Sequence, residues 1–121
     1  MKQDLIPANH LSKGHCVPCE GGVDPLTRTE FAPYLEIVKD WTVADDEKSL
    51  ERDYKFKDFK ETLAFVNKTG EIAESEGHHP DIYLHGWNKV RVTLSTHAIK
   101  GLSINDFVVA SKIDLIPLPI Q

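Results

Sequence analysis

The chain has 121 residues, of which 40% are hydrophobic and 27% charged, a composition that excludes an intrinsically disordered chain and fits one folded domain. Its formal net charge of -5 argues against a protein whose main task is to bind the nucleic acid backbone. The N-terminus lacks an apolar core of signal-peptide length, and no apolar run approaches a membrane span, so we expect a cytoplasmic protein without a membrane partner.

Residues 1–25 are rich in turn-forming residues and poor in apolar ones, which predicts an irregular arm lying over the domain. The arm holds both cysteines of the chain, Cys16 and Cys19, with His10 and His15 nearby. Two cysteines and two histidines could hold zinc, but both histidines precede the cysteines without a loop of zinc-finger length. A redox pair would need a strand and a helix around it. A plain arm is therefore favoured over a metal site.

The segment from Thr27 predicts the first helix. Thr27 and Glu30 have capping-box spacing, with Leu26 and Phe31 placed as a hydrophobic staple. Pro33 would remove a backbone hydrogen bond inside this helix, so we expect either a later start or a distorted first turn.

Two strands and a long helix follow. Residues 41–43 and 50–56 predict a hairpin, with a charged turn over 45–48. Asp58 is a candidate N-cap with Glu61 at the reciprocal position, and Gly77 is a natural terminator. The apolar stripe of this helix is predicted from four residues, with Phe65 and Ile72 flanking them: Phe59, Leu63, Val66 and Ala73.

A second pair of strands is predicted over 81–85 and 87–96, interrupted by Gly86. Alternation places Val90 and the following apolar residues on one face, and His97 continues the opposite, polar face.

The last helix begins at Ser103, with Asp106 completing a capping box, and cannot pass Pro117 and Pro119. The order is helix, two strands, helix, two strands, helix. It predicts an α+β fold over residues 26–121, a two-layer sandwich of a four-stranded antiparallel sheet with helices packed on one face. The other sheet face is then free for another subunit.

Four of the six histidines fall between residues 76 and 97, a concentration that indicates chemistry near neutral pH. His78 and His79 are adjacent, and Pro80 restricts the residue before it to extended backbone. Neighbouring residues of an extended chain point to opposite sides, so both rings enter one pocket only if the corner bends.

Glu74, His97 and Asp106 could join this corner at one edge of the sheet, because each lies at the end of a predicted element. Two imidazoles on opposite sides of a small molecule suit the elimination of water, one giving a proton and the other removing one. Carboxylates would orient the rings. A catalytic zinc is disfavoured because the helical His-Glu-x-x-His spacing is absent and adjacent histidines chelate one ion poorly.

Each candidate also has an ordinary structural interpretation. Asp106 could simply cap its helix, and Glu74 could be a solvated helix residue. Trp87 is of a type found more often in a core than in a pocket wall.

The spacing of these residues resembles the active-site signature of the pterin-4a-carbinolamine dehydratase family. The resemblance covers residues 26–114 and includes FKDF, NKVRVTLSTH and GLSINDFVVASKID. The arm sequence CVPCEGG resembles the longer bacterial and plant-type members. The signature positions, in chain order, are Glu74, His78, His79, Pro80, Trp87, His97 and Asp106.

The resemblance implies a hydro-lyase that converts 4a-hydroxytetrahydropterin to quinonoid dihydropterin and so recycles the cofactor of aromatic amino acid hydroxylases. It implies no metal, no bound cofactor, the α+β sandwich already predicted, and a homodimer or homotetramer. His78 and His97 would transfer protons, His79 would position the pterin, and the two carboxylates would support them. The expected substrate-binding residues are Pro80, Trp87, Ser95 and Thr96.

A different function is open on the same fold. Animal members of the family also act as dimerisation cofactors of a homeodomain transcription factor, and some relatives serve as assembly factors. A non-catalytic or dual-role binding protein is therefore the alternative, and the intact signature favours the enzyme.

Overall fold

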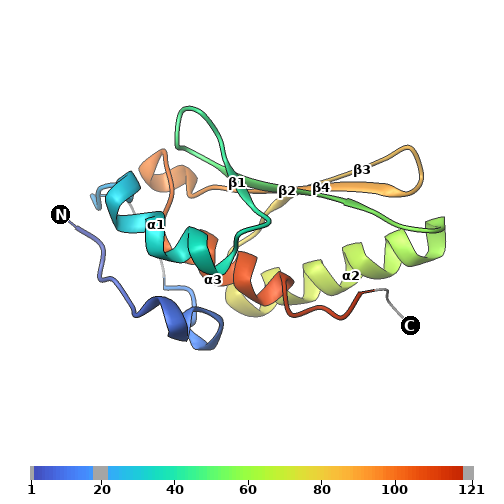
Figure 1. Cartoon of the computed structure of the whole chain (residues 1–121), viewed down its shortest axis with the longest axis horizontal. Helices are drawn as coiled ribbons and strands as arrows, with labels where there is room; N and C mark the ends of the chain where they lie inside the picture. The colour runs from blue at the N-terminus through green and yellow to red at the C-terminus, as the bar shows by residue number, and fades with distance from the viewer. Residues whose placement is uncertain (1, 18–21, 119–121) are drawn as a thin grey trace.

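The computed structural model describes residues 2–17 and 22–118. Within them, four strands form one antiparallel sheet in the order β1-β2-β4-β3, and the α-helices lie on one side of it (Figure 1). This confirms the predicted α+β sandwich. The elements are η1 (Ala8–Lys13), α1 (Arg28–Ile37), β1 (Thr42–Val43), β2 (Leu50–Lys55), α2 (Phe59–Glu76), β3 (Asp81–His85), β4 (Lys89–Leu94), η2 (His97–Ile99) and α3 (Ile104–Ile113).

The register of the sheet brings the end of β4 and the start of β3 to the same edge. Asp81 pairs with Thr93 at that edge, and His85 pairs with Lys89 at the other end of the hairpin. The turn between β3 and β4 uses positive φ at Gly86. As a result, the corner that follows α2 and the loop that follows β4 lie near one another.

The first helix starts where the capping box predicts. Thr27 is the N-cap, and its hydroxyl and the Glu30 carboxylate bond each other's backbone N–H groups. The helix begins directly after Thr27 and includes Pro33, which excludes the later start, the first of the two alternatives for this helix. The missing N–H of Pro33 is tolerated in a helix whose Phe31 and Tyr34 are buried in the core.

The predicted apolar stripe of α2 is wrong in two of its members. Phe59 and Leu63 are 49% and 42% exposed. The buried face instead runs through Thr62, Phe65, Thr69 and Ala73. It lies about 100° around the helix axis from Phe59 and Leu63, which is the rotation that one residue makes in an α-helix. Phe65, predicted only as a flanking residue, is the fully buried aromatic anchor of this helix.

The N-terminus of α2 also differs from a capping box. Asp58 accepts the Glu61 N–H at 2.8 Å, as predicted. The Glu61 carboxylate does not return the bond and lies 3.7 Å from the Lys57 ammonium instead. One side-chain cap is therefore enough to start this helix.

The predicted strand 87–96 is shorter in the structure. Positive φ at Trp87 places that residue in the hairpin turn, and β4 ends at Leu94. His97 does not continue the strand alternation but begins the 3-10 turn η2, after a bridge between Thr96 and Gly101. The helix α3 ends at Ile113, before Pro117 as predicted; Pro119 lies outside the described residues.

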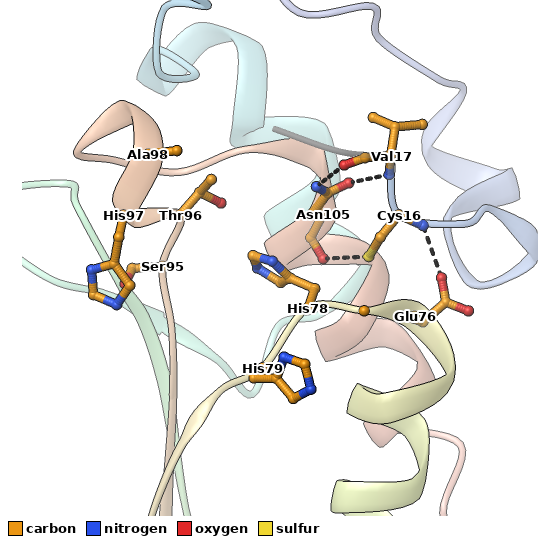
Figure 2. A pocket seen from close by; sticks show the side chains of 11 residues that line it. Cys16, Val17, Glu76, His78, His79, Ser95, Thr96, His97, Ala98 and Asn105 are labelled. Carbon is orange, nitrogen blue, oxygen red and sulfur yellow. Dashed lines mark hydrogen bonds between the residues drawn. The ribbon is translucent and has the colours of Figure 1, made fainter. Parts of the chain in front are cut away.

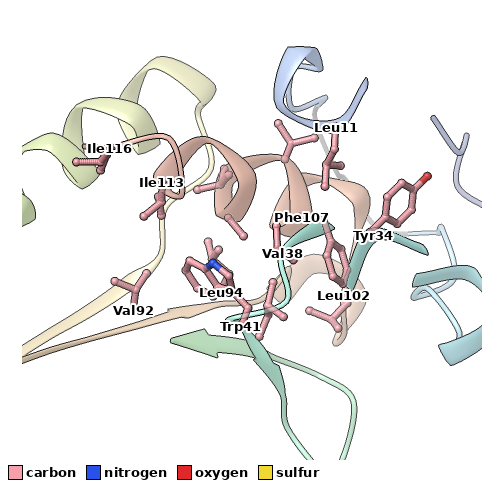
Figure 3. Packing of buried hydrophobic residues seen from close by; sticks show 14 of the residues in the cluster. Leu11, Tyr34, Val38, Trp41, Val92, Leu94, Leu102, Phe107, Ile113 and Ile116 are labelled. Carbon is pink, nitrogen blue, oxygen red and sulfur yellow. The ribbon is translucent and has the colours of Figure 1, made fainter. Parts of the chain in front are cut away.

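The arm contributes to the core of the domain (Figure 3). Leu11, on the short helix η1, is fully buried among residues of the same cluster as Tyr34 and Phe107. The Tyr34 hydroxyl donates to the Ile6 carbonyl at 2.5 Å. Residues 2–17 of the arm include the helix η1 and supply apolar contacts to the core, so this part of the arm is less irregular than expected.

The sheet face opposite the helices carries polar residues, among them the ion pair between Arg91 and Asp53 at 2.8 Å. In the described part of the chain no helix covers this face. Among the helices of residues 2–17 and 22–118, none is long and apolar enough to cross a membrane.

Candidate active site

The corner after α2 bends both adjacent histidines into one cavity. Gly77 ends the helix with φ of 64° and ψ of 26°, the left-handed conformation that glycine adopts without strain. The His78 N–H then bonds the Ala73 carbonyl at 3.2 Å, which fixes the start of the corner. The sequence left open whether the two rings could share a pocket, and the bend at Gly77 allows it.

This cavity has a volume of about 550 Å³ and lies between the α2 corner, the end of β4 and the arm (Figure 2). Its size is in the range of small-molecule sites. Segments far apart in sequence line it, with His97 on one side and the arm on the other. The lining residues are Cys16, Val17, Glu76, Gly77, His78, His79, Ser95, Thr96, His97, Ala98 and Asn105.

His78 is held by a buried carboxylate. Its Nε2 lies 2.6 Å from Oδ1 of Asp106, whose side chain is fully buried, while the His78 side chain is 13% exposed. A carboxylate oxygen accepts hydrogen bonds, so Nε2 carries the proton of this bond. In the neutral ring Nδ1 is then the free nitrogen, with a lone pair available to a ligand.

Asp106 is fixed by further hydrogen bonds on its other oxygen. Oδ2 accepts the Ser103 N–H at 2.9 Å and the Thr96 hydroxyl at 2.9 Å. Because the Thr96 hydroxyl donates its hydrogen to Asp106, the hydroxyl of Ser103 must donate to Thr96 Oγ1, at 2.7 Å. The capping box of α3 and the orientation of His78 therefore depend on the same carboxylate, and the cap and site roles of Asp106 coexist.

The other two histidines are more accessible. His79 Nε2 lies 2.8 Å from Oε1 of Glu74, and both side chains are largely exposed. The His97 ring is exposed and has no hydrogen-bond partner within residues 2–17 and 22–118, although it lines the same cavity as His78. Three imidazoles thus meet at one site with three different degrees of restraint.

Not every expected residue comes to this cavity. Ser95 and Thr96 line it, whereas Glu74 reaches it only through His79. Pro80 shapes the corner but is not a lining residue. Trp87 lies at the tip of the β3–β4 hairpin and is 58% exposed. At roughly 3.3 Å per strand residue, the tip lies about 20 Å from the edge where Thr93 pairs with Asp81, so Trp87 does not form a wall of its own chain's pocket.

The arm supplies pocket residues that sequence reasoning missed. The Cys16 N–H donates to Glu76 Oε1 at 2.8 Å, and the Val17 N–H donates to Asn105 Oδ1 at 3.0 Å. The Asn105 amide also donates to the Val17 carbonyl at 2.7 Å. Asn105 directly precedes the signature residue Asp106, and Glu76 lies between Glu74 and His78, but nothing in the local pattern indicates that they bind arm residues 88 and 60 positions away.

The contacts of Glu76 decide its charge. Burial raises its pKa, but the hydrogen bonds from the Lys112 ammonium, the Cys16 N–H and His15 outweigh burial and lower the pKa of Glu76 to about 2. The Lys112 bond measures 2.8 Å. Glu76 is therefore an anion at every physiological pH.

Cys16 has the opposite environment. Burial, followed by the negative charges of Glu76 and Asp106, raises the pKa of its thiol to about 12. The thiol donates to the Asn105 carbonyl at 3.6 Å. Such a thiol is a poor nucleophile and a poor metal ligand. The second residue of the predicted pair, Cys19, lies outside the described residues, and among those residues no group of three His, Cys, Asp or Glu side chains is arranged to hold a metal ion.

The sequence of the chain is similar to those of known proteins. The family model described as pterin 4 alpha carbinolamine dehydratase matches residues 24–116. A relative from Alkaliphilus metalliredigens is 48% identical over 88% of this chain and 95% of its own length. One from Methylococcus capsulatus is 45% identical over 90% and 95%. Both carry a provisional assignment as pterin-4-alpha-carbinolamine dehydratase.

Solved structures agree on the fold. A protein from Brucella melitensis described as a transcriptional coactivator/pterin dehydratase aligns with a TM-score of 0.69 and 32% identity, over 75% of this chain and 96% of its own. A pterin dehydratase-like protein described as a RuBisCO assembly factor in the alpha-carboxysome aligns with a TM-score of 0.53 and 22% identity, over 62% and 86%, and supports the fold alone.

Proposed function

The chain belongs to the pterin 4 alpha carbinolamine dehydratase family, and we propose that it removes water from 4a-hydroxytetrahydropterin to form quinonoid dihydropterin. The observation that carries this proposal is the pair of His78 and His97 on one cavity, the first locked by a buried carboxylate and the second without a partner in the described residues. Elimination needs two proton-transfer groups that act on neighbouring atoms, and this pair supplies them.

His78 is the base in this mechanism. Its Nε2 proton is held by Asp106, so Nδ1 is the nitrogen that takes the N5 proton of the substrate. His97 donates a proton to the 4a-hydroxyl. The C4a–O bond breaks, water leaves, and the C4a=N5 double bond forms. His78 then releases the proton it gained to solvent, and His97 takes up a proton from solvent.

The remaining groups position the substrate. His79, oriented by Glu74 at 2.8 Å, lies at the mouth of the cavity, where it contacts the pterin. The backbone of Ser95 offers hydrogen-bonding groups to the ring edge, whereas the Thr96 N–H and carbonyl are bonded to Gly101 and Ile99, so Thr96 acts as part of the cavity wall. Asp106 carries the stabilising charge for the imidazolium that forms on His78. A bicyclic pterin fits a cavity of about 550 Å³.

The proposed setting follows from the reaction. An aromatic amino acid hydroxylase releases the carbinolamine in the cytoplasm, and this enzyme returns the pterin to its cycle. We place the enzyme in a homodimer or homotetramer, since the polar sheet face and the exposed Phe59 and Leu63 of α2 offer surfaces for self-association.

A protein-binding role is the second candidate. The description of the Brucella melitensis protein, which is 32% identical, combines a coactivator with a dehydratase. The two roles are compatible because a binding surface elsewhere on the fold leaves the cavity free.

The test is the rate at which the purified chain dehydrates freshly generated 4a-hydroxytetrahydropterin, followed by absorbance after the spontaneous rate is subtracted. We expect acceleration that is proportional to enzyme concentration. A folded protein that gives no acceleration would refute the enzymatic proposal and leave the binding role.

A further inference from the structure

The N-terminal arm reaches the cavity through a short segment, the arm tip, which we define as residues 15–17. Cys16 and Val17 line the cavity on the side away from His97, with His78 between them in the view of Figure 2. Val17 is 66% exposed. The arm tip therefore forms a wall that a ligand can touch.

Two buried side chains hold the arm tip by its backbone. Asn105 is 4% exposed and makes two hydrogen bonds to Val17, one to its N–H and one to its carbonyl, in the manner of a paired strand. The Glu76 side chain is 5% exposed and accepts the Cys16 N–H. These three bonds engage the backbone of the arm tip, and the His15 ring and the Cys16 thiol add bonds to Glu76 and to the Asn105 carbonyl. The conformation of the arm tip is therefore set by the domain.

The same two residues adjoin the catalytic groups in the chain. Glu76 lies two positions before His78, and Asn105 lies directly before Asp106. Neither bonds the His78–Asp106 pair, which has its own partners in Thr96 and Ser103. Release of the arm tip would therefore remove a wall of the cavity while leaving the His78–Asp106 hydrogen bond intact.

A separate anchor keeps the arm on the domain when its tip is released. Leu11 is fully buried against α3 and α1, and the Tyr34 hydroxyl bonds both the N–H and the carbonyl of Ile6. The arm tip lies beyond this anchor and is held by these polar bonds together with the half-buried Cys16 side chain, which packs against the core.

We propose that the arm tip is a substrate-binding wall whose docking by Glu76 and Asn105 sets the affinity for the pterin. This inference rests on the proposed function for the identity of the substrate. Docking of the arm tip contributes to binding and not to proton transfer. Glu76 and Asn105 are thus positioning residues, and replacing them should raise KM while leaving kcat nearly unchanged.

The test compares Asn105→Ala with Asn88→Ala. Asn88 is also buried and its amide also donates to a backbone carbonyl, that of Phe56 at 3.2 Å, but it lies in the β3–β4 turn region away from the cavity. The two bonds lost at Asn105 predict a rise in KM of about fivefold or more, with kcat changed by less than about twofold. Amide hydrogen exchange of Cys16 and Val17 should accelerate in Asn105→Ala and stay unchanged in Asn88→Ala.

Two outcomes would overturn the proposal. In one, exchange shows that the arm tip is released and KM stays the same. In the other, the double variant Glu76→Gln/Asn105→Ala, which weakens all three bonds, still shows protected Cys16 and Val17 amides.

Binding of 7,8-dihydropterin to the same variants separates this inference from the proposed function. A wild-type protein that binds dihydropterin but does not accelerate dehydration would refute the proposed reaction. The ratio of the dihydropterin dissociation constants of Asn105→Ala and wild type would still show whether the arm tip contributes to binding. Absence of dihydropterin binding to the wild type would refute both.

Discussion

The Nε2 of His78 and the Oδ1 of Asp106 lie 2.6 Å apart and join the corner after α2 to the first turn of α3. Asp106 has no exposed surface, so its charge is stabilised only by the groups that bond it. The pair therefore behaves as one unit in which a structural cap orients a reactive ring.

The first prediction concerns the two carboxylates. Asp106→Asn replaces an acceptor that takes three hydrogen bonds, so the amide must turn a donor toward another donor and the preferred His78 tautomer is lost. We expect kcat to fall roughly 10²-fold or more and stability to fall by about 1–3 kcal/mol. Glu74→Gln, at an exposed pair, should cost less than about 1 kcal/mol and change kcat far less. Steady-state kinetics and urea unfolding of both variants check this, and an equal loss of kcat would contradict it.

The second prediction uses two glycines of one helix. Gly77→Ala forces a side chain into φ of 64° and should destabilise the protein by about 1–2 kcal/mol while displacing His78. Gly70→Ala, inside α2 with nothing within 4 Å of an added methyl group, should stabilise by about 0.5–1 kcal/mol. Thermal unfolding of the two variants should therefore shift in opposite directions. A shift in the same direction would contradict the assigned conformation of Gly77.

The third prediction is the pH dependence of Glu76. Its folded pKa of about 2 lies below the ordinary value of 4.5, so its stabilising contribution is complete above pH 4.5 and is lost as pH falls toward 2. We expect the difference in unfolding free energy between wild type and Glu76→Gln to be constant from pH 5 to 7 and to shrink toward zero near pH 2. A difference that persists at pH 2 would exclude the Lys112 and Cys16 bonds as its origin.

The fourth prediction concerns the thiol of Cys16. Because its pKa is about 12, the thiolate fraction at pH 8 is very small and iodoacetamide should modify it much more slowly in the folded protein than in urea. Both cysteines lie on the tryptic peptide 14–28, so tandem mass spectrometry of that peptide assigns the label to Cys16 or to Cys19. Equal rates in folded and unfolded protein would contradict the buried position of Cys16.

Several features of the fold and the site could be predicted from the sequence because the local signals are strong. The capping residues Thr27, Asp58 and Ser103 each start a helix as expected. The gathering of His78, His97 and Asp106 followed from elements that end at one edge of an antiparallel sheet. A turn or a cap is fixed by a few neighbouring residues, so a short sequence carries enough information.

Other features depended on contacts that no local pattern encodes. The buried face of α2 differs by one residue step from the predicted one, since Phe59 and Leu63 satisfy helical spacing as well as Phe65 does. The arm tip is placed by Asn105, 88 residues beyond Val17. Trp87 was expected at the pocket by resemblance, and hairpin geometry puts it at the far tip.

The most direct test of the central claim is the dehydration rate of three single variants. His78→Ala and His97→Ala each remove one proton-transfer group, whereas His10→Ala removes an exposed histidine of η1 outside the cavity. We expect kcat to fall roughly 10²- to 10⁴-fold in the first two and to be unchanged in the third, with the same unfolding midpoint within error for His97→Ala and His10→Ala. Full activity of folded His78→Ala and His97→Ala proteins would exclude these two histidines as the proton-transfer groups.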